Sequence, residues 1–319
     1  MSAAGGRDVH TAAVFVAAVV VTGGNAVAIR YSNRELDPLF GAAARFAVAA
    51  LVFAAVAAAG RRAWPRGRAL AGALLYGLLN FGLAYGFIYE ALREVHAGLA
   101  QIVLASVPLA TLLIAAGAGV EAFSWRRFAG TLVAVAGIAV VSGAGTTAFS
   151  ASSLLGIACM AAAAVSIGAG AVVVKVFPPV PGAPLNAVGM AVGAVALAVA
   201  SPLAGERWRV PVRGETFAAF GFLVVSTLIL FAAFLYVLRR WSASATSYQF
   251  LFVPIPAVIV SSLLDSEALT PALFLGGLLV LAGSYLGLRA GRSGARRAGR
   301  TAEGHLPGDA AARTDAPGR

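Results

Sequence analysis

Apolar residues along this chain occur in runs of roughly 20 positions, about the length that a helix needs to cross the hydrocarbon core of a bilayer. Core helices of soluble proteins are shorter and carry a polar stripe, which these runs mostly lack. Short polar connections separate the runs. The pattern predicts ten transmembrane helices, at residues 11–30, 38–59, 68–89, 96–118, 127–144, 152–175, 183–203, 215–238, 243–264 and 270–289.

The composition agrees with this prediction. Apolar residues make up 60% of the 319 positions, charged residues make up 12%, and the mean hydropathy is +0.87. A soluble domain has about a quarter of its residues charged, so most of this surface must face lipid. Because backbone groups in lipid must satisfy one another's hydrogen bonds, the spans are expected to be helices rather than open strands.

The net charge of +11 would suit a nucleic-acid-binding protein, but its distribution favours a membrane explanation. If the N-terminus is cytoplasmic, 17 basic residues fall in cytoplasmic segments, six fall in outer ones, and Arg45 stays within a span. This asymmetry follows the positive-inside rule. We therefore predict that both termini are cytoplasmic. Residues 1–10 are then a short cytoplasmic segment, and residues 291–319 are a disordered basic tail with no nucleic-acid partner.

Arginine provides all but one of the 24 basic residues, in a chain rich in alanine and glycine. This usage is typical of a GC-rich bacterial genome, so the bacterial inner membrane is the expected location. The lipid bilayer and a small-molecule substrate are the expected partners.

The second half of the chain repeats the first at an offset of 146 residues. Between positions 92 and 137, twelve of 46 residues are identical to their counterparts without a gap. One residue out of step, Gly23 to Arg30 also resembles Gly168 to Lys175. The identical pairs include Arg93/Arg239, Pro108/Pro254, Glu121/Glu267, Gly130/Gly276 and Gly137/Gly283.

Each repeat contains five predicted spans, and because five is an odd number the second repeat enters the membrane from the opposite side. The predicted fold is therefore all-α, with ten transmembrane helices as two inverted five-helix repeats, at 11–144 and 152–290. Inverted repeats recur in secondary transporters, where the substrate site lies near the membrane midplane between the halves. The alternative is that duplication produced a scaffold without a transport role.

The chain resembles the EamA-type family of the drug/metabolite transporter superfamily over residues 11 to 290. The resemblance implies a ten-helix exporter or facilitator of amino acids, metabolites or drug-like compounds, and it says little about the substrate. It is carried by Gly23-Gly-Asn-Ala-Val-Ala-Ile-Arg30, Pro38, Arg45-Phe46, Ala91-Leu-Arg93, Val107-Pro108, Glu121, Gly130 and Ala136-Gly137, and by the second copy at Leu238-Arg239, Val253-Pro254, Glu267, Gly276 and Ala282-Gly283.

Polar side chains within the spans are the candidate substrate-binding residues, because such groups are costly in lipid and usually face the bundle interior. Asn80 and its repeat counterpart Ser226 fall at midplane depth, and Tyr76 and Asn80 are expected to share a helix face. Interhelical hydrogen bonding is the alternative role. The candidates are Asn25, Arg45, Tyr76, Asn80, Gln101, Ser166, Ser226, Thr227, Tyr248 and Gln249. Such a lining suits neutral or zwitterionic solutes.

Arg45 is the most costly of these residues, about 10 Å into its span at 1.5 Å per residue. It is expected either to bind a substrate carboxylate or another anion, or to snorkel outward or pair with Asp37 or Glu90. Pro108, Pro254 and Pro256 each remove a backbone hydrogen bond, and serve either as hinges or as static kinks. Glu121 and Glu267 are expected to cap helices or to latch a gate.

A membrane-embedded enzyme and a non-transporting scaffold are the alternative functions. The sequence has no His-Glu-x-x-His or Gly-x-Ser-x-Gly pattern and no phosphate-binding loop around Lys175. No catalytic residue, metal site or cofactor is therefore expected. The sequence leaves open whether the protein is a monomer or a homodimer, and how transport is energised.

Overall fold

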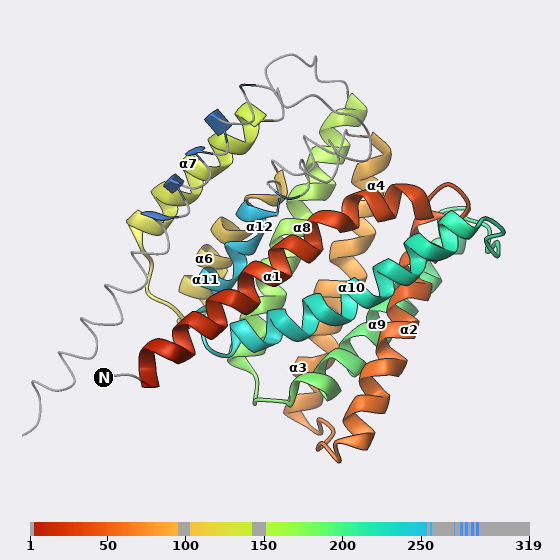
Figure 1. The fold of residues 1–319 in the computed structure, drawn as a ribbon, viewed down its shortest axis with the longest axis horizontal. Coiled ribbons are helices and arrows are strands. Elements are labelled where there is room, and N and C mark those ends of the chain that lie inside the picture. The colour runs from red at the N-terminus through yellow and green to blue at the C-terminus, as the bar shows by residue number, and fades with distance from the viewer. Residues whose placement is uncertain are drawn as a thin grey trace, which may run out of the picture.

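The computed structural model describes residues 3–94, 103–141 and 151–253, with isolated positions between 256 and 286. Within these parts of the chain every regular element is a helix and none is a strand (Figure 1). The elements are α1 (Ala3–Ser32), α2 (Pro38–Ala59), α3 (Arg68–Gly77), the π-helix η1 (Leu78–Leu83), α4 (Ala84–Glu94), α6 (Val107–Gly117), α7 (Trp125–Val141), α8 (Ala151–Val176), α9 (Gly182–Leu203), α10 (Gly214–Leu238), α11 (Ala243–Ser247) and α12 (Gln249–Phe252).

Five helices are long and apolar enough to cross a membrane, and they match five of the predicted spans. Two shorter apolar helices, Val9–Asn25 and Val107–Gly117, match parts of two more. Of the span predicted at 243–264, residues 254, 255 and 257–264 lie outside the described residues, as does more than half of the span predicted at 270–289. The five long helices are Pro38–Ala59, Arg68–Ala91, Leu154–Val176, Gly182–Leu203 and Gly214–Leu238.

The third span is one continuous helix whose central turn is π-helical, at η1. Glycines let it approach α9 closely there. A Cβ on Gly77 would lie 2.4 Å from the carbonyl oxygen of Gly189, and a Cβ on Gly193 would lie 2.1 Å from the Cβ of Phe81. The paired glycines of α9 therefore serve helix packing within the chain.

The fourth and ninth predicted spans, 96–118 and 243–264, are interrupted rather than continuous in the parts that the structure describes. A turn at Ala105–Ser106 precedes α6, so Pro108 stands in the first turn of a new helix. Proline is tolerated there because the amides of a first turn have no intrahelical partner. In span nine, Tyr248 separates α11 from α12, and a further turn at Val253 precedes Pro254.

Contacts between the helix ends establish the direction of each helix. The start of α2 meets the segment after α9, because the Arg207 amide donates to Asp37 at 2.7 Å. The segment after α1 meets the start of α10 through Glu35 and the Arg213 amide, 3.0 Å apart. α2 therefore runs antiparallel to α9, and α1 runs antiparallel to α10.

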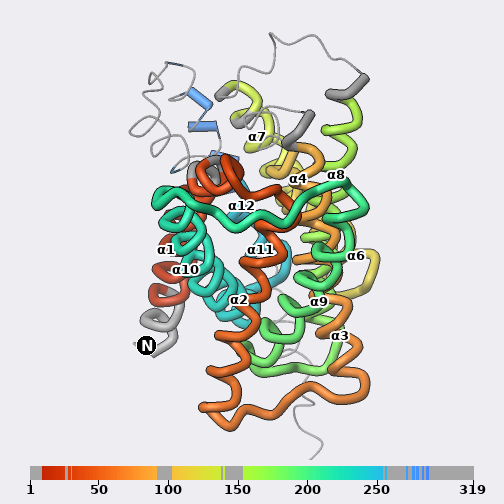
Figure 2. The backbone as a smooth tube through the Cα atoms, turned by 90° about the vertical axis from the view of Figure 1, so that its right-hand side faces the viewer, coloured from red at the N-terminus to blue at the C-terminus, as the bar shows by residue number. Residues whose placement is uncertain are grey.

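We name the two ends of the bundle after residues that lie there. The Glu206 end holds residues 33–37, 90 and 204–215, and the Arg239 end holds residues 60–68, 119–127, 175–181 and 239–242. Figure 2 shows α1 and α10 side by side, with α2 and α9 beside them and α4, α6 and α8 beyond. The third span packs along α8, and α6 packs against α8 and α11.

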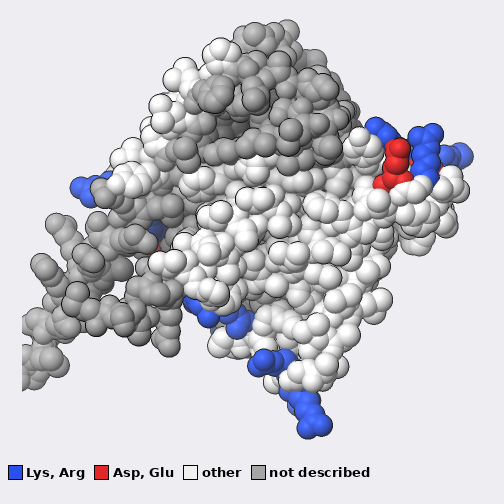
Figure 3. Space-filling model, viewed as in Figure 1, with Lys and Arg blue, Asp and Glu red and all other residues white. Residues whose placement is uncertain are grey.

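The two ends differ in charge. Among the described side chains, the Glu206 end carries four arginines and five acidic residues. The Arg239 end carries nine basic residues and one acidic residue, Glu121. Between the ends the visible surface is almost free of charge, as a lipid-facing belt requires (Figure 3).

Candidate functional site

Two polar contacts join the halves of the chain near the middle of the bundle. In the first, the Ser226 hydroxyl on α10 donates a 2.6 Å hydrogen bond to Oδ1 of Asn25 on α1. Ser226 is 1% exposed, so this bond lies in the interior. Asn25 and Ser226, two of the predicted site residues, are thus in contact. Their contact is an interhelical hydrogen bond, the role named above as the alternative to substrate binding.

In the second contact, Asn80 on η1 packs against Gly170 on α8. A Cβ on Gly170 would lie 1.6 Å from Nδ2 of Asn80, so the amide fills the space that glycine leaves. Asn80 is 4% exposed and its Nδ2 has no hydrogen-bond partner. A buried donor without a partner costs roughly 1–3 kcal/mol. An unpaired buried donor calls for an explanation such as a functional role, and π-helical turns are often found at functional sites.

The two contacts occupy equivalent positions in the repeats. Asn80 and Ser226 are 146 residues apart, and Asn25 and Gly170 are 145 apart, the two offsets at which the sequence repeats. Each contact joins the first half to the second. In one contact a large amide faces glycine, and in the other a small hydroxyl faces asparagine, so a similar volume is filled in two different ways.

Tyr76 and Asn80 do not share a helix face, contrary to the expectation from their spacing. The Tyr76 hydroxyl donates to Oδ1 of Asn186 on α9 at 3.4 Å, whereas Asn80 faces α8. The π-helical turn, with its i→i+5 hydrogen bonds, rotates the residues after Tyr76 away from the α-helical register. Asn186 is fully buried and its Nδ2 has no partner. Sequence reasoning missed it, although a polar residue within a span was the available signal.

Aromatic rings fill the interior between these contacts. Phe81 of η1 meets Phe231 of α10 at 4.6 Å between ring centroids and Phe46 of α2 at 5.1 Å. Tyr76 lies 5.4 Å from Phe81, and Tyr85 lies 4.7 Å from Phe46. Both tyrosines therefore join one aromatic cluster, which a regular α-helix would not allow. These rings pack against one another in the interior of the bundle.

Arg45 lies beside this cluster on α2. Its side chain is 2% exposed, so it does not snorkel outward. The guanidinium carbon lies 4.7 Å from the centroid of the Phe46 ring and 4.9 Å from that of the Tyr85 ring. Asp37, a predicted partner, instead accepts the Arg207 amide.

Of the other candidates, Ser166 and Thr227 make local contacts, whereas Tyr248 contacts the first half of the chain. The hydroxyls of Ser166 and Thr227 donate to carbonyls of their own helices, those of Ala162 and Leu223. The Tyr248 hydroxyl lies 3.4 Å from that of Thr131 and donates to the Arg127 carbonyl at 3.3 Å. Gln249 is buried. Gln101 and Pro254 lie outside the described residues, and Pro256 is described only as helical.

Carboxylates tie the halves together at the Glu206 end. Glu206, in the second half, accepts the amides of Leu39 and Phe40 at 2.9 Å each, so it caps α2 of the first half. The Trp208 ring stacks on Phe40 with 5.2 Å between centroids. The start of α2 is thereby fixed to the segment that follows α9. No sequence motif marks this cap, because Glu206 is far from α2 along the chain.

Glu35, in the first half, binds the start of α10 in the same manner. It accepts the Arg213 and Val212 amides at 3.0 and 3.4 Å. The neighbouring Thr216 hydroxyl and these two amides hold the pKa of Glu35 below its ordinary value. The Thr216 hydroxyl itself has no hydrogen-bond partner of normal geometry, so the two amides are the direct contacts of the carboxylate. The exposed pair Arg34–Glu215, at 3.1 Å, adds a surface ion pair.

Contacts at the Arg239 end also cross between the halves. Glu121 pairs with Arg127 at 2.7 Å and accepts the Ser244 amide, in the first turn of α11, at 3.1 Å. Glu121 therefore combines the predicted capping role with a tie between the halves. Its counterpart Glu267 lies outside the described residues.

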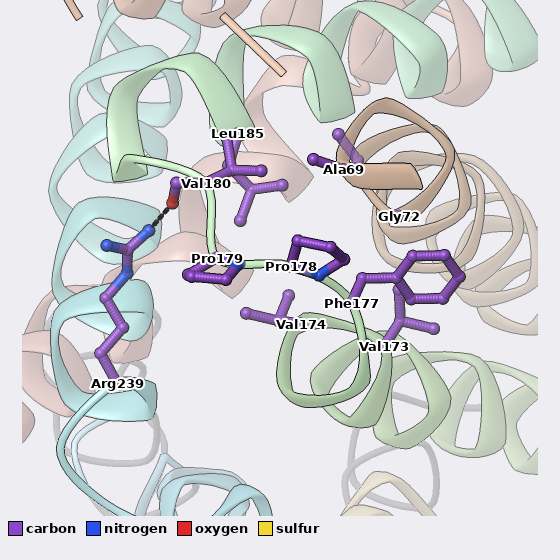
Figure 4. Close-up of a pocket in the computed structure, with 11 residues that line it drawn as sticks. Ala69, Gly72, Val173, Val174, Phe177, Pro178, Pro179, Val180, Leu185 and Arg239 are labelled. Carbon is purple, nitrogen blue, oxygen red and sulfur yellow. Dashed lines mark hydrogen bonds between the residues drawn. The ribbon is translucent and has the colours of Figure 1, made fainter. Parts of the chain in front are cut away.

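A small pocket opens at the same end between α3 and the second half (Figure 4). Its walls are mostly apolar, and Arg239 at its edge donates to the Val180 carbonyl. Its volume of about 70 Å³ is well below the roughly 300–1,000 Å³ of pockets that hold small molecules. In this conformation the pocket is too small for an organic solute.

Comparison with known proteins agrees with this architecture. The model of the EamA-like transporter family matches residues 11–143 and 154–289. The chain is 28% identical over 268 residues to the "Uncharacterized inner membrane transporter YedA" of Escherichia coli strain K12, covering 82% of this chain and 86% of that one. It is 27% identical over 278 residues to an "Uncharacterized transporter" of Archaeoglobus fulgidus, covering 82% and 92%. A solved crystal structure has the same fold, with a TM-score of 0.75 at 20% identity, over 89% of this chain and 99% of the other.

Proposed function

The chain belongs to the EamA-like transporter family, and from this premise we propose that it is a secondary transporter that moves a small organic solute across the bacterial inner membrane. The solute is an amino acid, a metabolite or a drug-like compound. The family match, the relatives named as transporters and the long apolar helices support a multi-pass membrane transporter. These names favour transport over catalysis.

The proposed architecture is ten transmembrane helices in two inverted repeats, 11–144 and 152–290. The opposite directions of α2 and α9, which occupy equivalent places in the two repeats, support it. The Arg239 end faces the cytoplasm in this proposal, because nine basic residues against one acidic residue suit the cytoplasmic side. Both termini are then cytoplasmic.

The proposed mechanism is alternating access by rocking of the halves. The observation that carries it is the pair of equivalent polar contacts, Asn80 with Gly170 and Ser226 with Asn25, between helices of opposite halves. A rocking motion changes both contacts together. In this conformation the halves are tied at both ends, by Glu206 and Glu35 at one and by Glu121 at the other. Each access step releases one set of ties.

The proposed solute site lies between the halves, beside Asn80, Ser226 and the aromatic cluster. Amide and hydroxyl groups next to aromatic walls suit a neutral or zwitterionic solute. Opening of either end separates Phe81 from Phe231, one ring from each half, and so exposes these groups.

Transport by purified protein in liposomes tests this proposal. Labelled amino acids and amphiphilic amines are screened with and without a pH gradient, against empty liposomes. We expect at least one solute to move faster with protein, and Gly170→Val to abolish the movement by displacing Asn80. Gly221→Val is the matched control, because a Cβ there meets nothing within 4 Å.

Two outcomes contradict the proposal. If no solute moves faster than in empty liposomes and Asn80→Ala has no effect on cellular solute export, the transporter assignment fails. If the protein converts a solute chemically without moving it, the enzyme alternative replaces it.

A further inference from the structure

Arg45 is a buried cation with free hydrogen-bond donors. Its side chain is 2% exposed, and its Nε and Nη2 atoms have no hydrogen-bond partner. A guanidinium stays charged at any physiological pH. Removing such an ion from water is costly unless it is paired and hydrogen-bonded. The Phe46 and Tyr85 rings offset part of that cost through cation–π contacts with the guanidinium.

The Glu206 carboxylate is engaged away from Arg45. Glu206 and Arg45 both lie close enough to Tyr89 to act on it electrostatically. Its two oxygens, however, accept the Leu39 and Phe40 amides and the Ser201 hydroxyl, at 2.8–2.9 Å. The nearby carboxylate thus stabilises the start of α2, and the free Arg45 donors are available to an acceptor from outside the chain.

The geometry around Arg45 defines the chemistry of that acceptor. A guanidinium with two free donors is a fork that matches the two oxygens of a carboxylate. Aromatic rings of Phe46 and Tyr85, with Phe81 next to them, provide walls for an apolar or aromatic body. Arg45 is enclosed within the bundle and so does not face lipid headgroups.

Only one of the repeats carries this cation. The position 146 residues after Arg45 is Ala191, an exposed residue of α9, while Tyr85 corresponds to Phe231. The anion-binding group therefore breaks the symmetry of the two halves. It lies about 10 Å into α2 from its start near the Glu206 end, at 1.5 Å per residue.

We propose that Arg45 binds the carboxylate of the transported solute, and that the solute is a zwitterion, such as an amino acid, whose carboxylate is attached to an apolar or aromatic body. This inference rests on the proposed transport function and names the substrate class of the same site. The Glu206 end covers Arg45 in this conformation, and its opening gives the carboxylate access.

Ligand binding by the purified protein tests the inference without requiring transport. The probes are 3-phenylpropionate, its neutral amide and phenethylamine, which share a phenyl body and differ in charge. Binding is measured from the shift of the thermal unfolding midpoint with probe concentration. We expect the carboxylate to bind in preference to the amide and the amine, and Arg45→Gln to weaken it roughly 10- to 100-fold, the loss of a charge-assisted pair.

Matched variants separate this role from a structural one. Arg34→Gln removes the same charge from an exposed site near the same end and should leave binding unchanged. Arg45→Lys, which keeps the charge, should retain part of the affinity, and Tyr85→Leu should weaken binding several-fold by removing one ring. These two variants decide the question if Arg45→Gln does not fold.

Equal binding of carboxylate and amide, no binding of the carboxylate, or full carboxylate affinity in Arg45→Gln overturns the inference. The same probes are then followed in liposomes. Transport of neutral or cationic solutes that is unaffected by Arg45→Gln leaves the proposed function standing and removes the role of Arg45. Binding of the carboxylate that depends on Arg45, without movement of any solute, supports the site and contradicts transport.

Discussion

Nδ2 of Asn80 lies 1.6 Å from the point at which a side chain on Gly170 would begin. The Asn80 side chain of the first half therefore occupies the space that a side chain at position 170 of the second half would need. Any movement of the two halves across this interface has to carry the amide past the glycine. The contact between Asn80 and Gly170 is accordingly the most direct place to test whether the halves move.

Gly170→Ala should lower stability and slow transport. The added methyl group displaces the Asn80 amide, and overpacking of this kind costs typically 1–3 kcal/mol. Thermal unfolding in detergent and solute uptake in liposomes measure the two effects. Gly221→Ala, on a helix face where a Cβ meets nothing within 4 Å, should instead raise stability by about 0.4–1 kcal/mol, because alanine loses less chain entropy than glycine on folding. Equal effects of the two substitutions would show that Gly170 is not a constrained position.

Asn25 and Ser226 should be energetically coupled. Their 2.6 Å hydrogen bond joins α1 to α10, and such bonds in membranes contribute roughly 0.6–2 kcal/mol. A double-mutant cycle with Asn25→Ala and Ser226→Ala measures the coupling energy from unfolding. Ser166→Ala serves as control, because that hydroxyl bonds only the Ala162 carbonyl of its own helix. Additive effects of the two substitutions would mean that the bond contributes nothing.

Glu206→Ala should loosen the Glu206 end. The substitution leaves the Leu39 and Phe40 amides without their cap, and loss of a helix cap costs about 0.5–2 kcal/mol. We expect faster trypsin cleavage at Arg207 and Arg209, which lie in the adjoining connection. The control is Glu215→Ala, whose partner Arg34 forms an exposed pair of little energetic value. Unchanged cleavage in Glu206→Ala would contradict the capping role.

Stability should fall in acid through Glu35. Its pKa is lowered in the folded protein, so its contribution is complete above the ordinary carboxyl value of about 4.3. The contribution disappears as the pH falls through the lowered folded value. The unfolding midpoint of Glu35→Gln should therefore lie below that of the wild type at pH 7 and approach it in acid. If the difference in unfolding midpoint between wild type and Glu35→Gln grew as the pH fell, the pKa of Glu35 would be raised rather than lowered by folding.

The Arg239 end should face the cytoplasm. Single cysteines at Arg66 and Arg209, in a Cys159→Ala background, report on the two ends of the bundle. A maleimide that does not cross membranes should label Arg209→Cys in intact bacterial cells, and label Arg66→Cys only after lysis. The reverse pattern would invert the proposed topology.

The long helices of the bundle could be predicted from the sequence. Runs such as 38–59 and 215–238 agree with α2 and α10 within a residue or so, because a single physical requirement, the thickness of the bilayer, determines their length. The separation of charges between the two ends was also predictable. Connections rich in arginine alternate along the chain with connections that carry both signs of charge, and because each span crosses the membrane, alternate connections lie at the same end.

The interior details depended on contacts that a linear pattern does not contain. The π-helical turn lies where Gly77 and Gly193 bring two helices together. The hydropathy of the sequence does not depend on whether this turn is α-helical or π-helical, so the hydropathy pattern could not predict it. That turn changed the face of Asn80 and brought Tyr85 into one cluster with Tyr76. The partner of Asn80 proved to be a glycine, which has no side chain to attract notice.

The cap that Glu206 places on α2 has a consequence during synthesis of the chain. The start of α2 enters the membrane long before Glu206 leaves the ribosome, since 166 residues separate Phe40 from Glu206. Until then two amides of its first turn must be satisfied by water or headgroups. The first half thus reaches its final conformation only when the second half is present, and the first half expressed alone should remain open to proteases at residues 33–37.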